Sequence, residues 1–365
     1  MSATSSAVSR NALVILAVIA AGATLYWLRD ILSPLALAMF LAVMIDGFAR
    51  VLERRLPGVS RRAAVPLAVV LSILIFSGTA IFIAANATSF ATQLVEYAPR
   101  LNGLIARVGG WIGIDVPPTV SDLFHQLDPA RHLGQVALGL QSFVSTAAFV
   151  LVYLGFIIAS RHGFERKIVS LFPVREERQE AMAAFMRIRD GVEQYLWVQT
   201  VTGLMIAVVS WIAMAAVGLD NAVFWAILIF IASYIPIIGG VVGVAAPPLF
   251  ALVQFDTLWQ ALTLFAVLQS LTLIVGNVVQ PRMQGRSLNI DPVVVLLALA
   301  FWGAIWGLAG AFLSTPLAVM MMVILAQFEG TRWVAVLLSA DGDPQQLRNR
   351  KPGHPPDAGP AKAAN

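Results

Sequence analysis

The sequence contains no cysteine and few charged side chains. The absence of cysteine excludes a disulfide framework and thiol catalysis. Only 12% of the 365 residues are charged, whereas 59% are hydrophobic, and the mean hydropathy is +0.81. A water-soluble fold cannot bury so much apolar surface, so the composition predicts an all-α polytopic membrane protein. The net charge of +4 is modest, and the 24 basic residues are spread between the apolar segments. We therefore expect a lipid bilayer and no nucleic acid as a partner.

Signatures of enzymes and metal sites are also missing. The four histidines (His125, His132, His162 and His354) lie outside the apolar segments, and no two have the spacing of metal ligands on a helix. Neither a Gly-x-Ser-x-Gly nucleophile turn nor a Gly-x-x-x-x-Gly-Lys phosphate loop is present. We therefore expect no enzyme activity, no cofactor and no metal site. A gradient of the solute or of a coupling ion (H⁺ or Na⁺) would have to drive any transport.

About eight apolar segments organise the chain. They cover residues 11–28, 32–49, 63–87, 138–160, 196–218, 222–254, 257–278 and 292–328. No convincing Ala-x-Ala cleavage site follows the first, so we expect a retained span instead of a signal peptide. The predicted parts are N-terminal spans (1–87), an extracytoplasmic amphipathic region (88–137), a fourth span (138–160), a cytoplasmic amphipathic linker (161–195), a transport bundle (196–328) and a largely disordered cytoplasmic tail (329–365).

The segment 222–254 is too long for one membrane span, which needs about 20 residues. It is too short for two complete spans with a normal turn. Pro236 and the pair Gly239 and Gly240 interrupt it without any charge. Such a break predicts two half-helices that meet at membrane depth, where non-helical backbone survives only inside protein or beside a watery cavity. Broken helices of this kind hold the substrate and ion sites of secondary transporters.

Basic residues predict the orientation, because cytoplasmic loops collect lysine and arginine. The loop after 32–49 and the segment 161–195 are rich in arginine, whereas 88–137 has few basic residues for its length. The first two should therefore be cytoplasmic and the third external. The N- and C-termini then both lie in the cytoplasm.

This orientation predicts a repeat. Because 196–218 runs outward, the segment 222–254 would begin and end outside as a re-entrant hairpin with its tip at 236–240. By the same argument 292–328 would begin and end inside, interrupted by the glycine-rich stretch 303–310. Two such units of opposite orientation form an inverted-topology repeat, which in transporters places the site at the repeat interface. The pattern leaves open a second interpretation, two tight helical hairpins with no role in a pore.

The C-terminal half resembles the autoinducer-2 exporter (AI-2E) family of transporters. The resemblance rests on YIPIIGG at 234–240, GNVVQPRMQGRSLNIDP at 276–292 and GLAGAFLSTPLAVMM at 307–321. It implies a multispan protein of the bacterial inner membrane that forms a homo-oligomer, such as a pentamer. The family name implies export of a small furanosyl signalling molecule, as in quorum sensing, although some members exchange Na⁺ for H⁺. The resemblance therefore does not settle the substrate.

Neutral polar residues are the candidates for solute contact, because ionisable side chains are almost absent from the spans. Asp46 should be interfacial, paired with Arg50, and Asp190 and Glu193 should belong to a salt-bridged surface. The candidate substrate-binding residues are Asn277, Gln269, Gln199, Gln280 and Thr315. The candidate hinge and hairpin residues are Pro236, Gly239, Gly240, Pro281, Gly307, Gly310 and Pro316. The polar residues could equally well tie helices together, each bond then contributing about 0.6 kcal/mol.

Three functions follow. The first is a secondary transporter that exports a small polar organic molecule by alternating access. The second is a cation/proton antiporter on the same fold, which the scarcity of carboxylates in the spans disfavours. The third is a membrane scaffold whose external region 88–137 binds envelope partners.

Overall fold

The computed structural model describes most of the apolar segments. The described residues are 2–55, 60–97, 99–100, 102–103, 145–160, 170–171, 173–284 and 289–342. They are nearly all helical and contain no strand, which confirms an all-α fold. Most of the predicted region 88–137, the start of 161–195 and the tail beyond 342 lie outside them.

Several helices have the length and composition to cross a membrane. Among the described residues, five helices reach this criterion: Arg29–Arg55, Ala63–Asn86, Arg175–Val217, Leu258–Gln284 and Pro292–Leu325. Shorter apolar helices cover Ala12–Trp27, Ser145–Ser160, Ala222–Ser233 and Ile238–Gln254. The chain is therefore a polytopic membrane protein.

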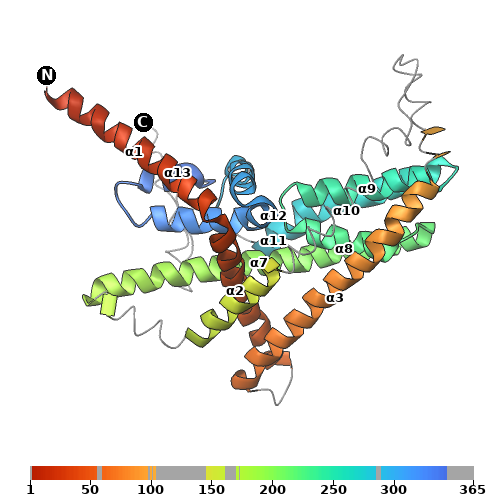
Figure 1. The fold of residues 1–365 in the computed structure, drawn as a ribbon, viewed down its shortest axis with the longest axis horizontal. Helices are drawn as coiled ribbons and strands as arrows, with labels where there is room; N and C mark the ends of the chain where they lie inside the picture. The colour runs from red at the N-terminus through yellow and green to blue at the C-terminus, as the bar shows by residue number, and fades with distance from the viewer. Residues whose placement is uncertain are drawn as a thin grey trace, which may run out of the picture.

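Helix α7 (Arg175–Val217) is the long central helix of the molecule (Figure 1). The helices that pack against it include α2 (Arg29–Arg55), α8 (Ala222–Ser233), α10 (Leu258–Ile274), α11 (Gln280–Gln284) and α12 (Pro292–Leu325). No proline interrupts it, so it continues through the predicted boundary at residues 195 and 196. At 1.5 Å per residue it is about 65 Å long, roughly twice the thickness of a bilayer core. It ends at Gly218, whose φ of 80° closes the helix in the left-handed conformation.

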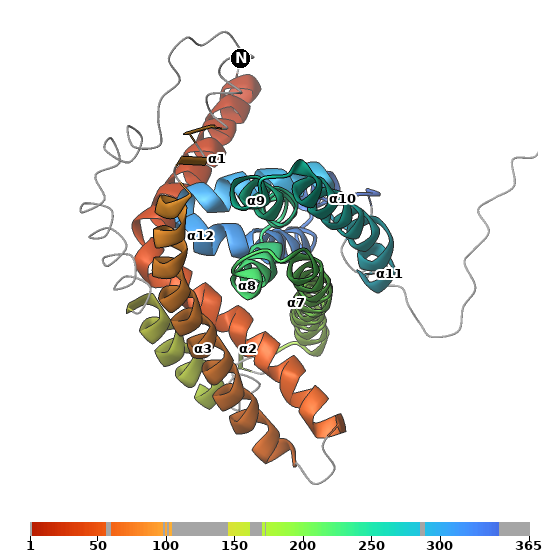
Figure 2. The ribbon, with the colours of Figure 1, turned by 90° about the vertical axis from the view of Figure 1, so that its right-hand side faces the viewer.

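Of the N-terminal helices, α2 packs against α7, and α3 packs against α2. Helices α2 (Arg29–Arg55) and α3 (Arg61–Glu96) lie against each other through small buried residues such as Ala38, Ala64 and Ala68, which let their backbones approach closely. Leu28 alone separates α1 (Ser2–Trp27) from α2. Helix α1 does not fold back along α2 in either view (Figures 1 and 2). The first two apolar segments therefore do not form an antiparallel pair, and the side on which the N-terminus lies stays a prediction.

The segment 222–254 forms a hairpin. Helix α8 (Ala222–Ser233) and helix α9 (Ile238–Gln254) pack against each other through Ile229 and Phe250. At the open end, Gln254 Nε2 donates to the Gly218 carbonyl (2.9 Å) and Gln254 Oε1 accepts from the Asp220 amide (2.8 Å). The segment thus begins and ends at the same end of the molecule, as its sequence predicts.

The second long segment also folds back on itself. Helix α12 (Pro292–Leu325) breaks at Gly307, where φ is 61° and ψ is −136°, a conformation suited to glycine. Its two arms pack together, with Trp302 against Leu313 and Leu317 on either side of the break. At the open end, Asp291 caps α12 by accepting from the Val293 amide (2.7 Å), and its own amide donates to the carbonyl of Leu338 (3.1 Å) in α13 (Arg332–Leu338).

A π-helical turn lies between the two hairpins. Helix α10 (Leu258–Ile274) continues through the π-helical turn η1 (Val275–Val279) into the short helix α11 (Gln280–Gln284). Pro281 gives a physical reason for the wider turn. It has no N–H to donate, and its ring would clash with the carbonyl of residue 277 in a regular α-helix.

Polar contacts mark two ends of the molecule. At one end, the Tyr97 hydroxyl donates to Asp220 (2.9 Å) and Arg100 pairs with Asp256 (3.3 Å), which joins the end of α3 to the open end of the α8–α9 hairpin. At the other end, Arg50 of α2 pairs with Glu193 of α7. The predicted salt-bridged environment of Glu193 is therefore present.

Cysteine labelling tests how these ends lie in the membrane, since the native chain has no cysteine. Single cysteines at Asp220 and Asp256 should react with an impermeant thiol reagent only from outside the cell. Cysteines at Gln284 and Gly330 should react only from inside, because they lie at the opposite, open end of the α12 hairpin. Labelling of Asp220 and Asp256 from opposite sides would contradict the hairpin orientation.

Candidate functional site

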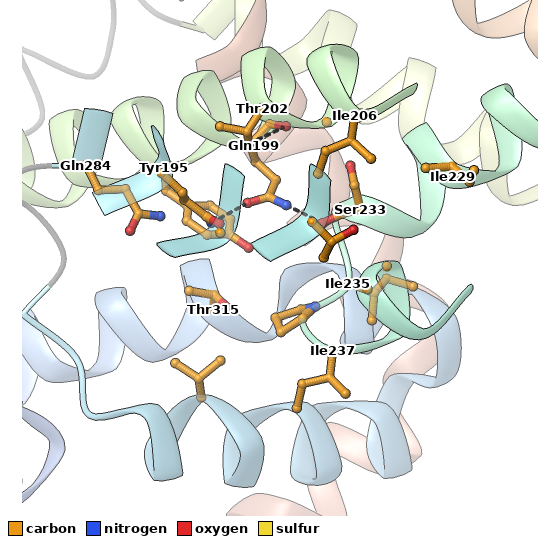
Figure 3. Close-up of a pocket in the computed structure, with 18 of the residues that line it drawn as sticks. Tyr195, Gln199, Thr202, Ile206, Ile229, Ser233, Ile235, Ile237, Gln284 and Thr315 are labelled. Carbon is orange, nitrogen blue, oxygen red and sulfur yellow. Dashed lines mark hydrogen bonds between the residues drawn. The ribbon is translucent and has the colours of Figure 1, made fainter. Parts of the chain in front are cut away.

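A cavity of about 380 Å³ lies between α7, the tip of the α8–α9 hairpin, the α10–α11 helix and the α12 hairpin (Figure 3). Its volume suits a small organic solute. Its polar lining residues are Tyr195, Gln199, Thr202, Ser233, Thr272, Gln280, Gln284 and Thr315.

One face of α7 forms the first wall. Tyr195, Gln199, Thr202 and Ile206 follow the three- and four-residue spacing of a helix face and all line the cavity. The Thr202 hydroxyl donates to the Val198 carbonyl of its own helix (2.8 Å). Among the α7 side chains that line the cavity, Tyr195 and Gln199 therefore have polar groups left for other elements.

A chain of two amide hydrogen bonds crosses the cavity. Gln199 Nε2 donates to the carbonyl of Ser233 at the end of α8, and Gln280 Nε2 donates to Gln199 Oε1 (3.3 Å; Figure 3). Gln199 thereby joins the hairpin tip to α11. Each bond is neutral, so a solute with hydroxyl or amide groups could exchange with it at little cost.

The hairpin tip approaches its surroundings closely. A Cβ on Gly239 would lie 2.5 Å from Ser233 Cα and 2.7 Å from the Ala232 carbonyl, so only glycine fits there. Ile237 has a φ of 67°, which is unusual for a β-branched residue and places strain at the tip. Tyr234 stacks on Phe312 of the second hairpin, with ring centroids 5.1 Å apart. The two hairpins therefore meet at this point.

The α12 hairpin contributes a buried hydroxyl. Thr315 is 6% exposed, and its Oγ1 has no hydrogen bond within normal geometry among the described residues. The next residue, Pro316, has no N–H to donate to the Phe312 carbonyl. The Tyr195 hydroxyl of α7 interacts with Thr315 across the cavity, so a solute or water could bind both hydroxyls at once.

The structure brings together part of the predicted site. Gln199, Gln280 and Thr315 line the cavity, as do the tip residues Pro236, Gly239 and Gly240. The other predicted residues, Asn277, Gln269, Pro281, Gly307, Gly310 and Pro316, do not line it. Asn277 is exposed, and its side chain donates to the Leu273 carbonyl of its own helix (3.0 Å). The Gly307 break lies at the tip of the α12 hairpin, whereas the cavity meets the arms at Val295 and Thr315.

Several lining residues were missed by sequence reasoning. Tyr195 was placed in the cytoplasmic linker, although it precedes Gln199 by one helical turn. Thr272, Gly276 and Gln284 line the cavity together with the predicted Gln280, at intervals of four residues. A spacing of four residues places these side chains on one face of a helix that contains the wider π-helical turn η1. The sequence shows this spacing, so it could have identified the face.

The cavity is neutral. As far as the structure describes it, the lining includes no Asp, Glu, Lys, Arg or His. Within the part of the chain that the structure describes, no group of three or more metal-ligating side chains occurs. Recognition in this cavity would therefore rest on neutral hydrogen bonds and apolar contact.

A second cavity of about 650 Å³ lies on a neighbouring face of α7 and is charged. Arg50, Arg189, Asp190 and Glu193 line it, together with Gln194, Trp197, Val198 and Met283. Gly47 leaves room for the half-buried Glu193, whose Oε1 would lie 3.3 Å from a Cβ there. We call this second cavity the charged vestibule.

Comparison with known proteins agrees with this architecture. The sequence pattern of the family described as AI-2E family transporter matches residues 13–330. The chain belongs to the AI-2E transporter family. The match spans both hairpins and the whole lining of the neutral cavity.

Relatives of this AI-2E family member share most of its length. The "AI-2 transport protein TqsA" of Escherichia coli K12 is 30% identical over 320 residues, which are 85% of this chain and 90% of that protein. The protein YhhT of the same strain is 25% identical over 325 residues, covering 89% of this chain and 91% of YhhT. A protein of Haemophilus influenzae is 27% identical over 322 residues, covering 85% and 90%. The chain is therefore a membrane transporter by family.

Proposed function

We propose that the protein is a secondary transporter that carries a small, neutral, polar solute through the 380 Å³ cavity by alternating access. The observation that carries this proposal is the neutral polar cavity at the point where both hairpins meet. A neutral or zwitterionic solute with several hydroxyl groups fits the amide and hydroxyl lining. Each hydrogen bond would contribute about 0.5–1.5 kcal/mol, so affinity should be modest.

The substrate class extends to an autoinducer-2-like signal, exported from the cell. The name of the relative TqsA, an AI-2 transport protein, supports this choice. The polar lining supports it too, because a furanosyl solute presents hydroxyl groups to Gln199, Gln280 and Thr315. The bacterial inner membrane, cytoplasmic termini and a homo-oligomer, such as a pentamer, belong to the same proposal.

An inverted repeat would supply the alternating access. The first unit is the apolar part of α7 with the α8–α9 hairpin, and the second is α10–α11 with the α12 hairpin. The open ends of the hairpins lie near Asp220 and Asn289, at opposite ends of the molecule, and their arms share one cavity. Movement of this bundle against α2 and α3 would expose the cavity to each side in turn.

A cation/proton antiporter remains the alternative, but the side chains that line the cavity fit this function less well. Proton coupling in membrane proteins commonly uses buried carboxylate or histidine side chains. None is among the described residues that line the neutral cavity. The scaffold hypothesis concerns the external region 88–137, most of which lies outside the described residues.

Reconstitution into liposomes tests the proposal. We expect flux of a labelled polyhydroxylated solute such as autoinducer-2, measured with and without an imposed pH or sodium gradient, with ion flux followed in parallel. Ion exchange without any solute flux would favour the antiporter instead.

Gln199→Ala should reduce solute flux by about tenfold or more, because it removes both hydrogen bonds that link the hairpin tip to α11. Asn277→Ala is the matched control, since that amide is exposed and donates to the Leu273 carbonyl of its own helix. Its flux should stay near the wild-type value. A larger loss in Asn277→Ala than in Gln199→Ala would place the solute outside this cavity.

A further inference from the structure

The neutral cavity and the charged vestibule are separated by a single layer of residues. Tyr195 and Gln199 of α7 line the neutral cavity, whereas the residues next to them, Gln194 and Val198, line the vestibule. On α11, Gln284 lines the neutral cavity and the preceding Met283 lines the vestibule. The contact between α7 and α11 is therefore the wall between the two spaces.

Weak, neutral hydrogen bonds hold this wall together. Gln194 Nε2 donates to the carbonyls of Met283 (3.4 Å) and Gln284 (3.3 Å). Gln280 Nε2 donates to Gln199 Oε1 at 3.3 Å. All three distances exceed the usual 2.9–3.0 Å for N–H to oxygen bonds. Met283 and Gln284 are the last described residues of α11, so Gln194 ties the described end of this helix to α7.

The packing of this helix changes abruptly at η1. Helix α10 is anchored by the buried residues Ala261, Leu264 and Leu268, whereas α11 has no buried residue. Between them lies the π-helical turn, a form that is rare and frequently found at functional sites. A Cβ on Gly276 within the turn would meet nothing within 4 Å. The loosely packed helix α11 thus follows the anchored helix α10, and the π-helical turn η1 between them can act as a hinge.

We propose that α11 is a gate between the neutral cavity and the charged vestibule, hinged at η1 and held shut against α7 by Gln194. Moving α11 away from α7 breaks the Gln194 and Gln280 bonds and joins the two spaces. The vestibule then provides a hydrated path from the neutral cavity to the end of the molecule where Arg50 pairs with Glu193. Its charged side chains are Arg50, Arg189, Asp190 and Glu193. Passage of solute through the gate rests on the proposed transport function, but the gate itself can be tested without any solute.

The test measures access to the neutral cavity with a cysteine introduced as Gly240→Cys. Gly240 lines the cavity on α9, away from the gate, and a Cβ there would lie 4.0 Å from its nearest neighbour, Thr272 Cγ2. The probe is a small, charged, membrane-impermeant methanethiosulfonate, applied separately to each side of membrane vesicles. A reference cysteine, Asp190→Cys, reports reaction in the vestibule.

With Gln194 present, Gly240→Cys should react from the vestibule side more slowly than Asp190→Cys. Gln194→Met keeps a similar side-chain length without the amide, and it should raise the Gly240→Cys rate about tenfold, the factor expected for losing two weak hydrogen bonds. Reaction of Asp190→Cys should not change. Gln280→Met, which removes the other bridge, provides a second variant if Gln194→Met fails to fold.

Three results would overturn the gate. The first is a Gly240→Cys rate that neither Gln194→Met nor Gln280→Met changes. The second is a Gly240→Cys rate equal to that of Asp190→Cys in the parent, and the third is reaction from the opposite side only. A protein that moves no solute in liposomes could still show the expected labelling, so failure of the gate and failure of the transport proposal are distinguishable.

Discussion

Gly310→Ala should prevent the α12 hairpin from closing. An added Cβ at Gly310 would overlap the Trp302 carbonyl, and it would lie 2.5 Å from the Trp302 carbonyl carbon and 2.9 Å from Trp306 Cβ. The carbonyl belongs to the backbone of the opposite arm and cannot rotate away, so the arms must separate. We expect a loss of about 3 kcal/mol of stability, the upper end of the usual cost of overpacking.

The measurement is the fraction of monodisperse protein that survives heating in detergent. Gly303→Ala is the matched control on the same helix. Its Cβ would meet only Ala311 Cβ at 4.0 Å, an ordinary contact, and alanine favours a helix over glycine by about 1 kcal/mol. Equal heat resistance of Gly310→Ala and wild type would show that the two arms are not in contact at this tip.

Gly239→Ala should abolish solute flux and lower stability by about 2–3 kcal/mol. The new Cβ would lie 2.9 Å from the Ser233 amide nitrogen and 2.5 Å from Ser233 Cα, so the end of α8 must shift. That shift moves the Ser233 carbonyl away from Gln199, the residue that also binds Gln280. One methyl group would therefore disturb both the hairpin tip and the cavity wall.

Gly240 separates these two effects. Gly240→Ala should transport nearly normally, because the nearest atom to its Cβ would be Thr272 Cγ2 at 4.0 Å. Gly240→Leu should keep its stability and lose flux, because the larger side chain enters the cavity that Gly240 lines. Flux in liposomes and heat resistance in detergent would be measured for all three variants. Wild-type flux in Gly240→Leu, or normal flux in Gly239→Ala, would contradict the assigned positions of the two glycines.

Membership of the AI-2E family and the polytopic helical class were predictable because each depends on features local to the sequence. Long uncharged runs identify membrane helices wherever they occur in the chain. The interruptions at Pro236 and Gly307 likewise appear as breaks in those runs, because proline lacks a donor and glycine tolerates positive φ. Both long runs form hairpins in the structure.

Tertiary structure alone decided which polar residues share the cavity. Gln199 and Gln280 are 81 residues apart and meet because α7 packs beside α11. The residues on the cavity side of α10–α11 depend on the register after η1, where the wider turn rotates the helix relative to a regular 3.6-residue period. Gln280 therefore faces α7, whereas Asn277 is exposed. The same holds for Gly239 and Gly240, since their different steric limits come from the distance to α8 and not from the pattern of the chain.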